Sequence, residues 1–143
     1  MPDIQLATLT KQLAIELDFP QTPEENKNGS YDLDFGEGLV ISIGSLHPGF
    51  YFSAKLGACP AQHCEDFFSV LMMANLFGTG TGGGVIALND EAKELTLSLA
   101  LPYQMPYFHF KEHIEDFLNH VDLWQKKTAD ASNPSAQRSN HLG

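Results

Sequence analysis

The strongest candidate for chemistry in this sequence is a pair of cysteines around a histidine, Cys59, His63 and Cys64. Pro60 is tolerated in the first turn of a helix, so the thiols are expected at a helix N-terminus, where a nearby histidine also favours a nucleophilic thiolate. No third residue that would orient the histidine is visible. Because free cysteine is also among the most buried residue types, structural roles are favoured over a catalytic one.

A second candidate is the segment His109–His113, which matches the H-x-x-E-H pattern of inverted zincins within a predicted helix. His120 continues the same helix face, which could suit metal ligands. That enzyme class needs a further downstream carboxylate ligand, and the chain has no Glu after Glu115. His109 and His120 are also about 16 Å apart at 1.5 Å per residue, too far to share one ion. We therefore expect a solvated helix flank and no metal site.

A glycine-rich segment, GTGTGGG at residues 78–84, invites comparison with loops that hold phosphate groups. Such a loop runs from a strand into a helix N-terminus, whereas here a predicted helix comes first and a strand follows. The lysine of GxxxxGK[ST] is also missing, so the segment is predicted to be a flexible helix-to-strand turn. Since no nucleophile elbow and no metal-binding cysteine cluster appears, the sequence predicts no catalytic residue, no cofactor and no enzymatic activity.

Composition limits the classes of partner. The 143 residues, 43% of them hydrophobic, fit one domain with a real core. Eight basic and eighteen acidic residues give a formal net charge of −10, which argues against nucleic acid or an anionic membrane as the main partner. No stretch approaches the ~20 apolar residues of a membrane span, and the N-terminus lacks the features of a secretory signal. Two cysteines are too few for a disulfide framework and favour a reducing cytoplasm.

Hydropathy patterns predict eight elements in the order α-β-β-β-α-β-β-α. This order predicts a single α+β domain over residues 1–127, with helices packed on an antiparallel sheet. The expected elements are helix 3–18, strands 31–35, 39–43 and 50–56, helix 60–77, strands 85–88 and 94–101, and helix 107–127. From Thr128 onward hydrophobicity collapses, which predicts a disordered polar tail over residues 128–143.

The predicted helix over residues 60–77 is apolar on two sides. Nine of the eleven residues of Phe67–Phe77 are hydrophobic, and Val70, Met73 and Phe77 form a second seam nearly opposite the one that can face the sheet. A surface helix of a small monomer needs only one apolar stripe. Either this is a central helix covered by the other two, or the second seam is a subunit interface rich in adaptable methionine.

The order of the elements and three short segments resemble class I type III secretion chaperones of the Tir chaperone (CesT-like) family. The first segment is LMMANLFG at 71–78 followed by TGGGVIAL at 81–88. It is similar to the family pattern of a helix that ends in a small residue, Asn and Leu, followed by a glycine-rich turn and a short strand. The others are LTLSLALP at 95–102 and the amphipathic C-terminal helix ending in VDLW at 121–124. The resemblance covers about residues 3–127.

This resemblance implies a cytoplasmic homodimer of a Gram-negative bacterium that serves virulence. It would bind the non-globular N-terminal segment of a secreted effector and keep it soluble and secretion-competent. The secretion-apparatus ATPase is implied as a further partner, and no cofactor is. Dimer contacts are implied at Val70, Met73, Phe77 and Val85. Effector contacts are implied on large apolar residues of the first helix and first three strands: Leu6, Leu9, Leu13, Leu17, Tyr31, Phe35, Phe50 and Phe52.

Two other functions stay open. One is a small thiol- or metal-dependent hydrolase using Cys59, Cys64 and the stripe of His109 and His113. The other is a stand-alone housekeeping protein of the same fold. If the protein does hold a cargo, the exposed edges of an antiparallel sheet invite an added strand. We therefore expect an extended, apolar-spaced cargo segment that pairs with an edge strand and carries some basic residues.

Overall fold

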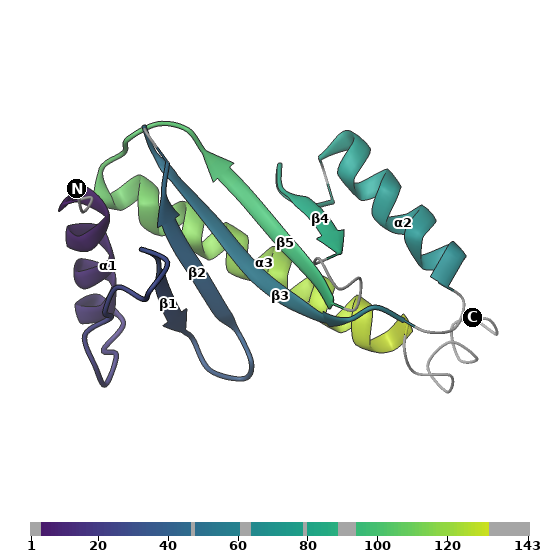
Figure 1. The fold of residues 1–143 in the computed structure, drawn as a ribbon, viewed down its shortest axis with the longest axis horizontal. Helices are drawn as coiled ribbons and strands as arrows, with labels where there is room; N and C mark the ends of the chain where they lie inside the picture. Colours follow the sequence, from purple (N-terminus) through teal and green to yellow (C-terminus); the bar gives the residue numbers. More distant parts are fainter. Residues whose placement is uncertain (1–3, 47, 61–63, 79, 89–93, 132–143) are drawn as a thin grey trace. The chain divides into compact units, whose positions relative to one another are not determined.

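A computed structural model describes residues 4–46, 48–60, 64–78, 80–88 and 94–131 (Figure 1), without the side chains of Ile4, Cys64, Glu65 and Phe77. The elements are α1 (Ile4–Glu16), β1 (Tyr31–Asp34), β2 (Val40–Ser45), β3 (Phe50–Ala58), α2 (Cys64–Phe77), β4 (Val85–Leu88), β5 (Glu94–Leu101) and α3 (Tyr107–Ala131). The five strands form one sheet in the order β1-β2-β3-β5-β4. This confirms the predicted element order and the α+β class with an antiparallel sheet.

The chain packs as two compact units, and each is described by itself. Unit 1 comprises residues 1–54 and 99–118, and unit 2 comprises residues 55–98 and 119–143. Strands β3 and β5 and helix α3 therefore contribute residues to both units. The expectation of a single domain over residues 1–127 stays a prediction.

The core of unit 1 is built from aromatic side chains of β3 and α3. β3 alternates between buried and more exposed residues from Phe50 onward, so Phe50 and Phe52 point to the same side of the strand. The ring of Phe110 stands edge-on to both, with centroids 5.7 and 6.0 Å away, and the ring of Phe117 lies 5.5 Å from Phe52. Each such pair contributes about 0.5–1.5 kcal/mol beyond the burial of apolar area.

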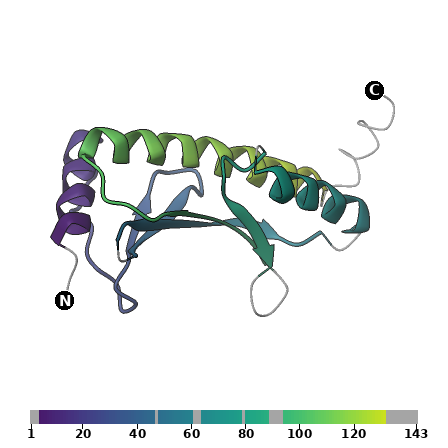
Figure 2. The ribbon, with the colours of Figure 1, turned by 90° about the horizontal axis from the view of Figure 1, so that it is seen from above.

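Helix α1 completes this core with Leu6, Leu9 and Leu13, all buried. It lies against the N-terminal end of α3 (Figure 2), where the carboxylate of Glu16 accepts hydrogen bonds from the Tyr107 hydroxyl and the Lys111 ammonium. The bond from Lys111, then that from Tyr107, lowers the pKa of Glu16 below its ordinary value. Burial, then the bond to Glu16, raises the pKa of Tyr107. A charged Glu16 thus joins the end of α1 to the first turn of α3.

Unit 2 is organised around Trp124. Its indole N–H donates to the carbonyl of Gly80 at 2.7 Å, which anchors the glycine-rich segment to α3. A Cβ at Gly82, where φ is +64°, would lie 2.7 Å from the His120 ring. The described part of this segment is therefore a closely packed turn between α2 and β4, because glycine lets its backbone approach these rings. The flexibility expected of it stays a prediction.

Helix α3 is longer than predicted. It continues to Ala131, so residues 128–131 are helical rather than part of a disordered tail. This added turn carries Thr128, which is 2% exposed and lies close to Gly57 of β3, where an added Cβ would be 3.5 Å from the Thr128 methyl group. It extends the buried stripe of Val121 and Trp124 by one turn, although its polar character hides this in the sequence. The predicted disorder of residues 132–143 lies outside the described residues.

We predict that the free energy of unfolding of the Glu16→Gln variant depends less on pH, below about pH 4.5, than that of the unmutated protein. Because the pKa of Glu16 is lowered in the folded state, its charge stabilises the fold above about pH 4.5, and this contribution is lost as pH falls through the lower folded-state value. The difference between the unmutated protein and Glu16→Gln in free energy of unfolding should therefore shrink as pH falls below 4.5. Urea unfolding at a series of pH values measures it.

The control is Glu112→Gln, which removes an exposed carboxylate from α3, the helix that carries the two partners of Glu16. It should show no such trend. An equal loss for both variants at every pH would contradict the role given to Glu16.

Candidate functional site

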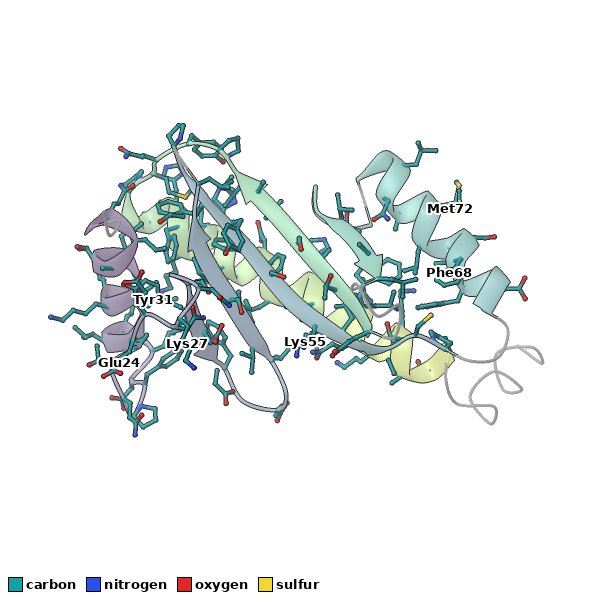
Figure 3. All side chains as sticks on the ribbon, in the orientation of Figure 1. Glu24, Lys27, Tyr31, Lys55, Phe68 and Met72 are labelled. Atoms are coloured by element: carbon teal, nitrogen blue, oxygen red, sulfur yellow. The ribbon has the colours of Figure 1, made fainter. Side chains whose placement is uncertain are left out.

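Helix α2 carries a broad exposed apolar face. Val70, Met72, Met73 and Leu76 are between 48 and 74% exposed, and Met72 projects from the side of α2 that faces away from β4 (Figure 3). Large apolar side chains are costly to leave in water, at about 1.5–3 kcal/mol each. Among the described residues of unit 2, nothing covers these four side chains of α2.

Strand β4 lies beside α2 (Figure 1) and adds two further exposed large apolar residues. We call the six residues of the two elements the α2–β4 surface: Val70, Met72, Met73, Leu76, Val85 and Leu88. Three of the four residues expected at a dimer interface, Val70, Met73 and Val85, belong to it. The side chain of the fourth, Phe77, lies outside the described residues.

The sequence analysis missed the two most exposed members of this surface, Met72 and Leu76. Both belong to the run of nine hydrophobic residues. When hydrophobic residues occur on every side of a helix, however, the sequence does not indicate which side faces outward. The structure shows which side of α2 faces inward, because Phe67, Leu71 and Ala74 are buried. The Asn75 side chain also fixes this orientation of α2, because it is hydrogen-bonded to the backbone of Ile86 in β4.

The residues expected to contact an effector divide into two groups in unit 1. Five of them are buried in the core: Leu6, Leu9, Leu13, Phe50 and Phe52. The other three are accessible: Leu17 is 42% exposed, and Tyr31 and Phe35 are half-buried. This second group is accessible without any opening of the core.

One accessible residue of β1's C-terminal side, Phe35, lies beside the segment that follows α1. Asp18 adopts a left-handed conformation with φ +58°, and the Phe19 N–H donates to the Ala14 carbonyl at 2.9 Å, as in a Schellman motif. The chain therefore turns sharply, and the Phe19 ring meets the Phe35 ring at 5.5 Å. We call the resulting group the α1-end surface: Ile15, Leu17, Phe19 and Phe35. Ile15 and Phe19 were not expected from the sequence.

The candidate catalytic residues do not assemble a site among the described residues. The Cys59 side chain is half-buried, and its sulfur lies 3.9 Å from the Pro60 carbonyl oxygen, while His63 and the Cys64 side chain lie outside the described residues. His113 shares a hydrogen bond of 3.2 Å with the Tyr103 hydroxyl. The described ranges contain no group of three or more His, Cys, Asp or Glu side chains that could hold a metal ion. None of the described helices is both long and apolar enough to cross a membrane.

Solved structures of other proteins share this fold. A chain in the crystal structure of the ExsC–ExsE complex matches with a TM-score of 0.71 and 15% identity, covering 88% of this chain and 96% of that one. One in the HopA1–SchA chaperone–effector complex matches with a TM-score of 0.69 and 12% identity, covering 86% and 94%. One in the heterodimeric ExoU–SpcU complex from the type III secretion system of Pseudomonas aeruginosa matches with a TM-score of 0.54 and 17% identity, covering 91% and 95%.

Sequence comparison identifies the relationship. A protein of Chlamydia pneumoniae is 28% identical over 123 residues, which cover 83% of this chain and 92% of that protein. The model of one protein family also matches residues 8–125, from within α1 to within α3. The matched range contains the whole sheet, the whole of α2 and all residues of the α2–β4 and α1-end surfaces. On this evidence the chain belongs to the Tir chaperone protein (CesT) family.

Proposed function

We propose that this protein is a type III secretion chaperone that binds the non-globular N-terminal segment of a secreted effector and keeps it soluble and secretion-competent. The observation that carries the proposal is the family match over residues 8–125. Two structures of the same fold support it, since one is a chaperone–effector complex and another comes from a type III secretion system. The proposal assigns the protein no catalytic step, and neither the comparisons nor the described residues support a thiol- or metal-dependent hydrolase.

The α2–β4 surface is proposed as the interface of a homodimer. Its four α2 side chains are large, apolar and at least 48% exposed, and a second copy would remove them from water. Two of them are methionines, whose flexible side chains fit irregular partner surfaces. In a two-fold symmetric pair the same patch of each copy covers the other.

The α1-end surface, together with Tyr31, is proposed as a contact for the effector segment. Exposed Ile15 and Leu17 precede Phe19 by four and two residues, and the Phe19 ring packs on Phe35, so an extended chain can place apolar side chains there. The net charge of −10 favours a segment with some basic residues. The proposal also includes pairing of the segment with a sheet edge, a cytoplasmic location and, at delivery, the secretion-apparatus ATPase as a partner.

We predict that the unmutated protein is a dimer of about twice 15.7 kDa and that Met73→Asp shifts it toward monomer or aggregate. A carboxylate at this position would be buried without a partner in the dimer, which costs several kcal/mol. Light scattering on the eluting peak measures the mass.

The matched control for the dimer is Leu123→Asp, because Leu123 is 44% exposed but lies on α3, outside the α2–β4 surface. It should remain dimeric. An unmutated protein that is monomeric at all accessible concentrations would end the dimer proposal.

The secretion function is tested by purifying the protein from its native host and identifying what comes with it. We expect one or a few secreted proteins, retained through an N-terminal segment. Affinity for that segment should persist at high salt, because apolar burial is not screened, whereas a purely electrostatic contact would weaken steeply. Leu17→Asp should weaken binding at least about tenfold, as a carboxylate replaces an apolar contact.

Leu123→Asp again serves as the control and should bind like the unmutated protein. Hydrogen exchange of the complex should show new protection in α1 and in a strand of unit 1. Protection confined to His109 and His113 or to residues 132–143 would refute the proposed mode of binding. Failure of any secreted protein to co-purify would favour the stand-alone housekeeping alternative.

A further inference from the structure

The outer edge of β4 is occupied by a side chain. β4 is the last strand in the order of the described sheet, and its pairing with β5 uses one edge only. At its other edge the Asn75 side chain of α2 makes two hydrogen bonds to a single residue, Ile86. The Asn75 amide nitrogen donates to the Ile86 carbonyl at 2.9 Å, and the Ile86 N–H donates to the Asn75 amide oxygen, also at 2.9 Å.

This pairing reproduces what a neighbouring strand would do. In an antiparallel ladder, residues alternate between those whose N–H and C=O both face one neighbour and those whose groups face the other. Both groups of Ile86 are taken by Asn75, so Ile86 is a residue whose backbone faces away from β5. A carboxamide carries the same donor and acceptor as a peptide group, so Asn75 satisfies Ile86 as a strand would.

The start of the same edge is also closed. Gly84 is two residues before Ile86, so its backbone groups belong to the same alternating set. Its carbonyl accepts a hydrogen bond of 2.7 Å from the Thr81 hydroxyl, and its N–H donates to the Thr81 carbonyl at 3.2 Å. The Thr81 side chain is itself buried. Gly84 immediately precedes the four-residue strand and Ile86 lies within it. At both of these outward-facing positions the backbone groups are thus already paired inside unit 2.

We propose that Asn75 closes the edge of β4 to strand addition. An unpaired edge accepts strands from other molecules indiscriminately, and proteins protect such edges by covering them. With Asn75 in place, a second copy of this chain can contact the α2–β4 surface through side chains but cannot extend the sheet from β4. Insofar as the proposed function holds, an effector strand is likewise excluded from β4, so any strand addition takes place elsewhere on the sheet.

The experiment removes the closing group in the full-length protein without any cargo. Asn75→Ala should make the Ile86 amide exchange with solvent at least about tenfold faster, since it loses its acceptor. The variant should also form assemblies larger than the unmutated protein as concentration rises, with increased β signal in circular dichroism. Light scattering over a concentration series and residue-resolved hydrogen exchange give the two measurements.

A second substitution separates edge pairing from general damage to α2. Ala87 is exposed on β4, and a lysine on an edge strand opposes strand addition. Asn75→Ala combined with Ala87→Lys should return to the size of the unmutated protein while Ile86 still exchanges fast. Asn75→Asp is used if the alanine variant does not fold. The aspartate keeps an acceptor for the Ile86 N–H, so the Ile86 amide should exchange at a rate between those of the unmutated protein and the alanine variant. Its charge opposes strand pairing, so the size of the protein in solution should be unchanged.

Three results would overturn the inference. One is unchanged exchange at Ile86 in Asn75→Ala, and another is accelerated exchange with no change in size at any concentration. The third is assembly that the added lysine does not reverse. Because no effector is present, each of these results leaves the proposed chaperone function untouched, and failure to find an effector leaves the closed edge untouched.

Discussion

The buried stripe of α3 is the constraint on which the other elements depend. In unit 1 the rings of Phe110 and Phe117 pack edge-on against β3, and α1 is joined to the first turn of the same helix through Glu16. In unit 2 Trp124 holds the glycine-rich segment, which leads directly into β4. One long helix therefore supplies apolar side chains to both cores. A rotation of α3 about its own axis would move those side chains out of place in each unit.

Local patterns in the sequence predicted most elements because their physical causes are local. The predicted bounds of β4 and β5 agree with the structure. In Glu94–Leu101 leucine occupies every second position, which is typical of a strand. The end of α3 was predicted too early because the last turn carries Thr128, a polar residue that is buried near Gly57 of β3, far away in the sequence. The tight turn after α1 depends on a left-handed Asp18, which no pattern of hydropathy reveals.

The surfaces were harder to predict than the fold for one physical reason: burial in a core and burial against a partner both select apolar residues. The stripe of Leu6, Leu9 and Leu13 was expected to contact an effector, and the structure places it in the core. On α2 the same ambiguity hid Met72 and Leu76. On α2 a polar interaction removes this ambiguity. The hydrogen-bonded amide of Asn75 fixes the side of α2 that faces β4, and the opposite side is therefore left outward.

Trp124 is the only tryptophan in the chain. Its ring is buried, its N–H is bound to the Gly80 carbonyl, and the Lys127 ammonium lies 5.7 Å from the ring centroid. Indole emission shifts in wavelength and intensity when the ring meets water, so the protein carries an intrinsic fluorophore at the junction of α3 and the glycine-rich segment. Separation of that segment from α3 can therefore be followed optically, in real time and without a label.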